Sequence, residues 1–342
     1  MSLHPREENH AYLEESTMHA VVLRSFGPAE NLSYEVVPDP EPGPGQVRIA
    51  VRAAGVHLVE TMLRQGRASD SLPPLPELPA ILGGEVAGRV DAVGPDVDPA
   101  WLGRDVVTSA GRPGGYAELA VADVTALHRV PAGLDPETAV AMVVTGRTTL
   151  EFLDVAKLTA ADVVLVTSAA GGIGRLLVQH ARDLGARVIG AAGGPAKVAA
   201  VRELGADLAV DYDLPGWERT VAAWLGGRKV SAVLDGVGGD RARATFELLA
   251  DGGRFLSIGN ATQQPVEVDP HLLEGRALTV TNALWIIIGR PHDRPRFEAE
   301  ALAAAAEGRL VPAVQTFPLA EAAAAHAALE SRRTTGKVVL VS

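Results

Sequence analysis

The chain has 342 residues, a formal net charge of −11, 47% hydrophobic residues and 21% charged residues. This is a globular composition long enough for two domains, and its acidic balance with scattered Lys and Arg argues against a nucleic-acid partner. The lack of Cys excludes disulfides, Cys-ligated zinc and iron–sulfur clusters, and no apolar run approaches the roughly 18 residues of a membrane span, so we expect a cytoplasmic protein without a membrane partner.

Residues 1–17 are polar and precede a second methionine, Met18. They lack the apolar stretch of a signal peptide. We interpret them as a disordered leader or residues left over from cloning, with folded structure beginning near Met18.

The stretch from Met18 to about Ala126 is predicted to be rich in β-strands. Short apolar runs separated by Pro and Gly clusters, such as residues 38–45, are typical of strands joined by turns. Many short strands at close spacing indicate a small barrel or sandwich. The predicted strands are 19–24, 46–54, 88–93, 105–109 and 116–121.

From about Pro136 the pattern changes to alternating strands and helices. The almost wholly apolar stretch 162–167 is typical of a central parallel strand, and Gly185 and Gly205 each follow a predicted helix. This alternation indicates a doubly wound parallel sheet. Strands are predicted at 162–167, 187–192, 208–210, 230–234 and 254–258, with helices at 173–184, 195–204 and 241–249.

The C-terminal part is predicted to contain helix 297–307, strand 311–317, helix 319–330 and strand 337–341. The last strand could return to the first domain. Before this tail, the apolar segment 279–288 would suit an edge strand that pairs with a second copy of the chain, and Leu284, Trp285 and Ile286 would otherwise border a substrate cleft.

Residues 168–174 directly follow the apolar strand and open a helix. In that context small residues let the backbone approach a pyrophosphate, and the helix N-terminus presents free N–H groups to it. A plain Gly-rich turn is the alternative. The cofactor-binding residues predicted in this loop are Ala169, in the place of the usual first glycine, Ala170, Gly171, Gly172, Ile173 and Gly174.

The next strand predicts which dinucleotide is preferred. Folds that bind NAD usually place Asp or Glu about 20 residues after the glycine pattern, whereas this strand ends at Ala192 and Gly193. A carboxylate would repel a 2′-phosphate, while Lys197 and Tyr212 could bind one. We therefore predict NADPH as the cofactor, with Gly193, Lys197 and Tyr212 in its site, although Lys197 alone would be read as an exposed helix lysine.

The sequence resembles the medium-chain dehydrogenase/reductase superfamily, in its zinc-free quinone oxidoreductase (zeta-crystallin-like) branch. The resemblance runs from Met18 to Ser342 and is carried by six segments in order. It implies an α/β fold with a GroES-like catalytic domain at 18–142 and 285–342 and a Rossmann NADPH-binding domain at 143–284. The segments are 54–61 (AGVHLVET), 82–88 (LGGEVAG), 114–118 (GGYAE), the loop 169–174, 259–260 (GN) and 335–340 (TGKVVL).

The resemblance also implies an enzyme without a metal. Zinc-dependent relatives hold the metal with Cys, His and Cys, and the matching positions here are His57, Gly84 and Ala141, of which only His57 can bind zinc. Without a metal to polarise the substrate, the expected reaction is hydride transfer from NADPH to an activated acceptor, a quinone or an α,β-unsaturated carbonyl.

Site residues follow from the same resemblance. Quinone reductases usually carry Asn where this chain has His57, which could donate a proton or simply line the cleft. Thr145 should approach the nicotinamide amide, and Arg147 is a candidate to bind a phosphate, an acidic substrate group or a salt-bridge partner. Gly259, Asn260 and Lys337 are predicted near the cofactor, although Lys337 could equally be an ordinary lysine at a strand end.

Two other functions stay open. An enoyl-thioester reductase would need a basic channel, for which Arg64, Arg67 and Arg147 are candidates, and a nucleotide-binding protein with little catalysis would need none. Relatives are commonly homodimers or homotetramers, so self-association is expected.

Overall fold

The computed structural model describes residues 16–68, 73–109, 114–264 and 266–342. Most of the predicted leader, residues 1–15, lies outside these ranges. The prediction that Ser16 and Thr17 belong to the leader is wrong, because Thr17 begins strand β1 (Thr17–Leu23) and Ser16 Oγ donates a 2.6 Å hydrogen bond to Asp39.

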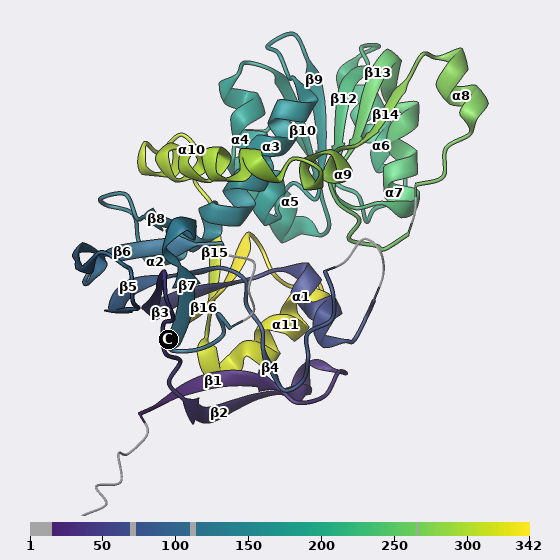
Figure 1. Cartoon of the computed structure of the whole chain (residues 1–342). Helices are drawn as coiled ribbons and strands as arrows, with labels where there is room; N and C mark the ends of the chain where they lie inside the picture. The colour runs from purple at the N-terminus through teal and green to yellow at the C-terminus, as the bar shows by residue number, and fades with distance from the viewer. Residues whose placement is uncertain (1–15, 69–72, 110–113, 265) are drawn as a thin grey trace, which may run out of the picture.

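The molecule consists of two halves stacked one above the other (Figure 1). The upper half contains a six-stranded parallel sheet, and we call it the parallel half. The lower half contains a seven-stranded sheet and a three-stranded sheet, and we call it the mixed half. Within the described ranges, no helix has the length and apolar character needed to cross a membrane. The predicted combination of a β-rich domain with a doubly wound α/β domain is confirmed.

The sheet of the parallel half has the order β11-β10-β9-β12-β13-β14, with every pair parallel. Counted along the chain this is 3-2-1-4-5-6, so the strand order reverses between β9 and β12. The strands are β9 (Val163–Thr167), β10 (Arg187–Ala192), β11 (Leu208–Asp211), β12 (Val230–Asp235), β13 (Leu249–Ser257) and β14 (Thr279–Asn282).

Helices cover both faces of this sheet because its strands are apolar on both sides. Along β9, Val164 and Val166 point into one core and Leu165 into the other, as the alternation of a strand requires. The first core is shared with α3 (Arg147–Ala156), α4 (Gly172–Asp183), α5 (Pro195–Glu203) and α9 (Ala283–Ile288), and the second with α6 (Trp217–Leu225) and α7 (Gly239–Ala244).

Two predicted elements of this half differ from the structure. The helix predicted at 241–249 ends early, because α7 is followed by a short 3₁₀ turn and Leu249 already begins β13. The edge strand predicted through 288 stops at Asn282, whose side chain accepts a 3.2 Å hydrogen bond from Trp285 N and so begins α9. The short α8 (Pro270–Gly275) precedes β14.

The mixed half is organised around β3 (Gln46–Val56), which pairs with three other strands. Its larger sheet has the order β15-β16-β3-β5-β6-β8, with β7 also paired to β3, and β2-β1-β4 form the smaller sheet. The remaining bounds are β2 (Leu32–Pro38), which the sequence did not predict, β4 (Ala80–Ile81), β5 (Val86–Val93), β6 (Asp105–Thr108), β7 (Leu119–Asp123), β8 (Leu127–Arg129), α1 (Leu58–Arg64) and α2 (Pro136–Ala141).

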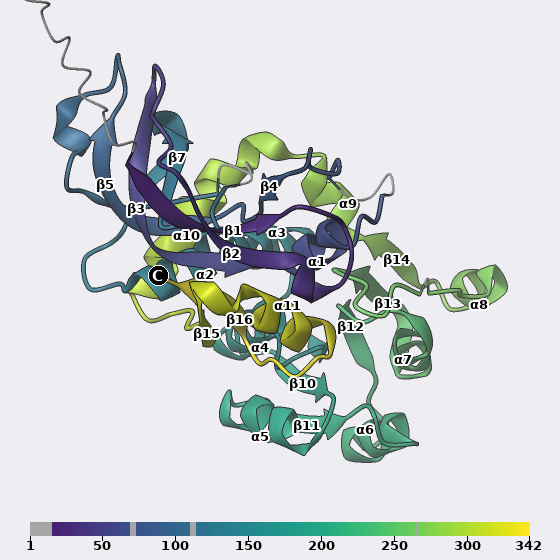
Figure 2. The same ribbon diagram turned by 90° about the horizontal axis from the view of Figure 1, so that it is seen from below.

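The C-terminal strands return to this half, as the sequence suggested. β16 (Lys337–Val341) pairs antiparallel with β3 and parallel with β15 (Val314–Pro318). Seen from below, α11 (Ala322–Glu330) lies beside these strands and contacts α1 (Figure 2). The predicted domain boundaries remain a prediction, and the one after residue 284 falls inside α9. After it, α10 (Arg294–Ala306) packs on α3.

A buried hydrogen-bond network fixes the carboxyl ends of β9 and β12, where the strand order reverses. Thr167 Oγ1 donates to Asp235 Oδ1 over 2.6 Å and accepts from Gly236 N over 3.0 Å. Asp235 is fully buried, and its other carboxylate oxygen accepts from Gly238 N over 2.9 Å. Burial raises the pKa of Asp235. The Thr167 hydroxyl therefore links β9 and β12 at the point where the strand order reverses.

Replacing that hydroxyl should destabilise the fold. Thr167→Val keeps the shape of the side chain but leaves Asp235 Oδ1 and Gly236 N short of a partner, so we expect the free energy of unfolding to fall by about 1–3 kcal/mol. Urea unfolding followed by circular dichroism measures the change. Thr220→Val, on the exposed surface of α6, is the control and should alter stability by less than about 0.5 kcal/mol.

Candidate functional site

The loop that follows β9 makes a tight turn into α4. Ser168 has a positive φ of 53°, and Gly171 N donates to Ser168 O over 2.9 Å. A Cβ atom on Gly174 would lie 2.2 Å from Ser168 O, so only glycine allows the helix to begin this close to the strand. The turn leaves the first N–H groups of a twelve-residue helix free to bind an anion.

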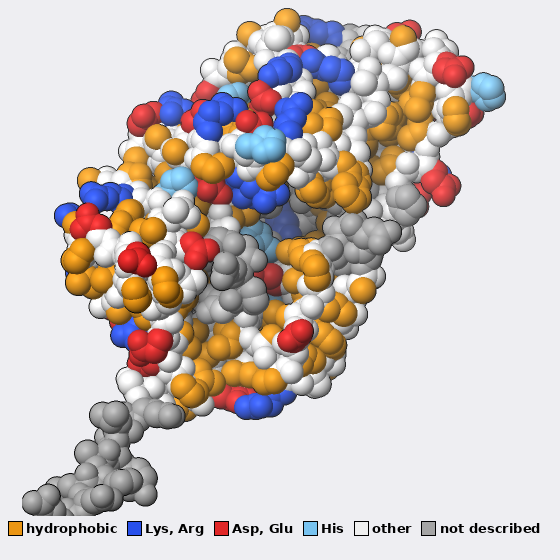
Figure 3. Space-filling model, viewed as in Figure 1, with side chains coloured by type: hydrophobic (Ala, Val, Ile, Leu, Met, Phe, Trp, Pro, Cys, Tyr) orange, Lys and Arg blue, Asp and Glu red, His pale blue; other side chains and the backbone are white. Residues whose placement is uncertain are grey.

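A cavity of about 400 Å³ lies over this loop. Both halves contribute to its wall, which is the arrangement expected of a ligand site between domains. The surface is hollowed between the two halves, and basic, acidic and histidine side chains are visible in the hollow (Figure 3). The cavity is lined by Leu58, Thr61, Gln65, Arg67, Ser168, Ala170, Gly171, Gly172, Ala192, Lys197, Tyr212, Val237, Ala261, Gln263, Leu329, Glu330, Arg332, Thr334 and Gly336.

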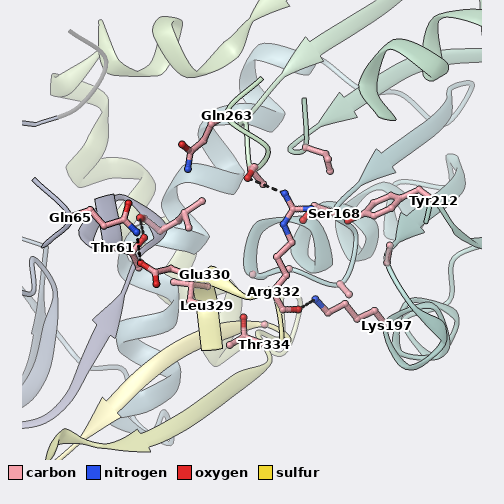
Figure 4. Close-up of a pocket in the computed structure, with 18 of the residues that line it drawn as sticks. Thr61, Gln65, Ser168, Lys197, Tyr212, Gln263, Leu329, Glu330, Arg332 and Thr334 are labelled. Carbon is pink, nitrogen blue, oxygen red and sulfur yellow. Dashed lines mark hydrogen bonds between the residues drawn. The ribbon is translucent and has the colours of Figure 1, made fainter. Parts of the chain in front are cut away.

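Three side chains that can bind an anion meet at one end of the cavity. Lys197 Nζ donates to the backbone oxygen of Arg332 over 2.7 Å, and the Arg332 guanidinium extends past Tyr212 and donates to Ala261 O over 3.2 Å (Figure 4). Burial and the charge of Arg332 lower the pKa of Lys197. Lys197 and Tyr212 were predicted to bind the 2′-phosphate, and the structure brings them together with Arg332.

Arg332 could not be predicted from the sequence, because its place at the cavity depends on tertiary structure. Arg332 lies in the loop between α11 and β16, 135 residues after Lys197 in the chain. This loop lies against the turn after β9, because Gly336 N donates to Ala170 O over 3.1 Å. Arg332 therefore comes close to Lys197 because β16 returns to the mixed half.

A carboxylate does lie near this end, contrary to the sequence-based expectation. Asp213 Oδ2 is 2.4 Å from the point where a Cβ atom on Gly193 would be. The carboxylate forms an ion pair with Arg241, and the Arg241 guanidinium lies 5.1 Å from the centroid of the Tyr212 ring. Neither Asp213 nor Gly193 lines the cavity, so the charged side chains that line this end of it are Lys197 and Arg332.

Some predicted cofactor residues lie behind the cavity wall rather than in it. Ala169 is fully buried and donates its N–H to Ala191 O. The side chain of Asn260 accepts from Thr262 Oγ1 over 3.2 Å, and Ala261 and Gln263 line the cavity instead. The other predicted residues outside the lining are Thr145, Ile173, Gly174, Gly193, Gly259 and Lys337.

The two residues predicted after α2 have different surroundings. Thr145 is 7% exposed, and its Cγ2 lies 3.1 Å from the point where a Cβ atom on Gly172 would be, so it packs directly against the cofactor loop. Arg147 instead forms ion pairs with Glu298 at 3.2 Å and Glu151 at 3.5 Å, and it does not line the cavity. Of the open alternatives for Arg147, the structure shows the salt bridge.

A compact group of three ionisable side chains lies beside the other end of the loop. His57 Nε2 is 2.9 Å from Glu85 Oε1 and 2.9 Å from Lys337 Nζ, and Glu85 and Lys337 form an ion pair with each other. Burial alone would raise the pKa of Glu85, but the charges of His57 and Lys337 outweigh it and lower the pKa to about 2. The carboxylate is therefore ionised although it is fully buried.

Strand register brings these three residues together. β16 pairs with β3 so that Val338 is opposite Val56, which places Lys337 beside His57. β5 pairs with β3 so that Val86 is opposite Ala54, which places Glu85 beside Gly55. A Cβ atom on Gly55 would lie 1.7 Å from Glu85 Oε1, so glycine is required there.

A second carboxylate holds the backbone of His57. Glu60 Oε2 accepts from His57 N over 2.7 Å and from the Tyr116 hydroxyl over 2.8 Å, and Glu60 Oε1 accepts from Gly84 N over 3.1 Å. Tyr116 also lies 3.2 Å from His326 Nε2. Burial and the charge of Arg64 lower the pKa of His326 to about 3, so this histidine is neutral.

The positions that bind zinc in related enzymes offer few ligands here. Gly84 and Ala141 carry no donor side chain. Across the parts of the chain that the structure describes, no three His, Asp or Glu side chains gather closely enough to hold a metal ion.

The geometry fits an extended dinucleotide. Free N–H groups at the start of α4 suit a pyrophosphate, and Lys197, Tyr212 and Arg332 suit a further phosphate at one end. His57 and Lys337 lie beside the opposite end, next to the residues Leu58 and Gly336 that line the cavity.

Comparisons with known proteins agree with this arrangement. Residues 43–132 match the family model described as alcohol dehydrogenase GroES-like domain, and residues 204–340 match the model described as zinc-binding dehydrogenase. The chain is 35% identical to a quinone oxidoreductase of Pseudomonas aeruginosa over 94% of this chain and 98% of that protein, and 32% identical to a 2-haloacrylate reductase of a Burkholderia species over 95% and 98%.

Among solved structures, the Escherichia coli quinone oxidoreductase complexed with NADPH superposes with a TM-score of 0.83 at 27% identity, over 96% of this chain and all of that one. The likeness therefore covers both halves and the cavity between them. The chain belongs to the medium-chain dehydrogenase/reductase superfamily, in its zinc-free quinone oxidoreductase branch.

Proposed function

We propose that the protein is an NADPH-dependent reductase that passes a hydride to a quinone or an α,β-unsaturated carbonyl. The observation that carries this proposal is the cavity over the tight turn, with Lys197, Tyr212 and Arg332 at one end and His57 beside the other. Bound NADPH would supply the hydride. The residues of this chain would bind its phosphates, orient it along the cavity and exclude water.

The relatives support both parts of the proposal. The solved Escherichia coli quinone oxidoreductase is complexed with NADPH, and the Pseudomonas relative is named for quinones. The Burkholderia relative is named for 2-haloacrylate, which is an α,β-unsaturated acid. An activated double bond accepts a hydride without a metal to polarise it, which suits a site whose zinc-ligand positions carry Gly84 and Ala141.

The structure offers less support for an enoyl-thioester substrate. Of the three arginines considered for a basic channel, Arg64 is fully buried against Glu330 and Arg147 is paired with Glu298 and Glu151. Only Arg67 is exposed and lines the cavity. The three therefore do not form one basic surface.

The acceptor class can be tested directly. We expect the purified protein to oxidise NADPH in the presence of quinones or 2-alkenals, and to leave saturated aldehydes and alcohols unchanged. Absorbance at the reduced nicotinamide band measures the rate over a panel of acceptors. Tight binding of NADPH without reduction of any acceptor would instead support a nucleotide-binding protein with little catalysis.

The cofactor preference should depend on Lys197. Loss of one charged contact to the 2′-phosphate costs about 1.5–3 kcal/mol, so Lys197→Ala should raise the KM for NADPH by about 10- to 100-fold and leave the KM for NADH unchanged. Lys229→Ala is the matched control, because Lys229 is an exposed lysine of the same half that also donates to a backbone oxygen. An equal effect on both cofactors would contradict the assignment.

We also propose that β14 mediates self-association. β14 is an edge strand of the parallel sheet, and four large apolar side chains on β14 and α9 are exposed: Val280, Leu284, Trp285 and Ile288. An exposed apolar edge invites pairing with another strand.

Val280→Lys should therefore yield a monomer, since a lysine on an edge strand opposes pairing. Sedimentation analysis is expected to show a dimer or tetramer for the natural chain. Val311→Lys, at an exposed valine outside this edge, is the control and should leave the mass unchanged. A natural chain that sediments as a monomer would rule out the proposal.

A further inference from the structure

None of the three ionisable side chains beside the cavity is among the residues that line it. Lys197, Tyr212 and Arg332 define the phosphate-binding end. From there the cavity extends along the loop after β9 to Gly172. Gly171 and Gly336 form a bridge at this point, and Lys337 is the next residue after Gly336. His57, Glu85 and Lys337 thus lie beside the end of the cavity where the reacting part of a dinucleotide would be.

We propose that His57 is the proton donor of the reduction, and that Glu85 and Lys337 are positioning residues that hold its imidazole ring. The inference rests on the proposed function and adds to it the source of the proton that every such reduction consumes. His57 is the member of the group that can touch an acceptor, because its side chain is 26% exposed, whereas those of Lys337 and Glu85 are 5% and 0% exposed.

The contacts of His57 Nε2 hold the imidazole ring in one orientation. Glu85 can only accept a hydrogen bond, and the Lys337 ammonium can only donate one. Nε2 lies 2.9 Å from both Glu85 Oε1 and Lys337 Nζ, and of these two contacts only the one with Lys337 has hydrogen-bond geometry, so Nε2 accepts from the Lys337 ammonium. Lys337 thus holds Nε2 by a hydrogen bond and Glu85 holds it by charge, and together they fix the orientation of the ring.

The ring is also held in place from its backbone. Glu60 accepts from His57 N, and His57 is the N-cap residue of α1. The charges of Glu85 and Lys337 offset one another, so the ring lies beside a neutral pair rather than beside an isolated buried charge.

The reduction adds one hydride and one proton to the acceptor. The acceptor gains a hydride, which is two electrons and one hydrogen nucleus, at its β-carbon, while NADPH is oxidised to NADP⁺. The π electrons of the double bond move toward the carbonyl and leave a negative charge on the α-carbon and oxygen. An N–H bond of the His57 imidazolium then breaks, a C–H or O–H bond forms on the acceptor, and solvent returns a proton to the imidazole.

Chemical rescue tests the role of His57. A general acid contributes about 10²- to 10⁴-fold, so His57→Ala should lose at least about 10²-fold in kcat with a 2-alkenal, keep the KM for NADPH within about twofold, and recover part of its rate when imidazole is added. If the natural chain is active and His57→Ala keeps its kcat, the inference is wrong and the proposed function stands. If none of the acceptors supports oxidation of NADPH by the natural chain, both the inference and the proposed function are wrong.

Glu85→Gln tests the positioning role, since it removes the charge but keeps the size of the side chain. We expect kcat to fall at least tenfold with an unchanged KM for NADPH. Glu298→Gln is the matched control, because it alters a carboxylate–imidazole contact of the same 2.9 Å length, to His128, that does not line the cavity. An equal loss of kcat in both variants would overturn the role.

A second variant covers the case in which Glu85→Gln does not fold, because it leaves the Lys337 ammonium buried without a carboxylate. Glu85→Gln combined with Lys337→Met removes both charges and should fold. Its kcat should still fall at least tenfold, since neither partner of Nε2 remains charged. Full activity of this double variant would show that the pair does not position His57.

Discussion

The buried carboxylate of Glu85 is the charge around which the mixed half is arranged. An ionised group with no exposed surface is tolerated only when an opposite charge accompanies it. That charge comes from Lys337, more than 250 residues away in the chain, which requires β16 to lie against β3. The same pairing places Gly336 on the cofactor loop and so brings the two halves together around the cavity.

The cavity is consequently assembled from both halves at each end. At the phosphate end, Lys197 and Tyr212 come from the parallel half and Arg332 from the loop before β16. At the other end, the cavity is lined by Gly172 of the parallel half and by Leu58 and Gly336 of the mixed half. A bound dinucleotide would therefore contact side chains whose relative positions depend on the whole chain rather than on one domain.

Local patterns predicted the parts of this structure that local physics determines. The bounds of β10 and β16 agree residue for residue with the predicted strands, because their apolar runs are bounded by glycines and charged residues. The tight turn after β9 was predicted because close backbone approach demands small residues. Lys197 was singled out because it follows a strand that lacks an acidic residue, and Tyr212 because it follows the third short strand; both line the cavity.

What the sequence could not reveal depends on contacts between distant segments. Arg332 was not singled out, since nothing near it in the chain marks it as part of a site. Glu85 lies next to the predicted site position Gly84, but its pairing with Lys337 depends on tertiary structure. Arg147 was considered for substrate or phosphate, yet Glu298 from α10 reaches it in the folded chain. The continuation of the edge strand through 288 failed for a local reason, because a cap by Asn282 outweighed the β-propensity of the isoleucines.

The central position of β16 has a consequence for how the molecule must be made. A ribosome releases β3 nearly 300 residues before β16, so until β16 emerges β3 has one edge unpaired and Glu85 lacks its ammonium partner. The parallel half, whose strands are contiguous in the chain, has no such dependence and can complete its sheet first. A nascent chain stalled before β16 would thus display a finished parallel sheet beside an open, aggregation-prone strand.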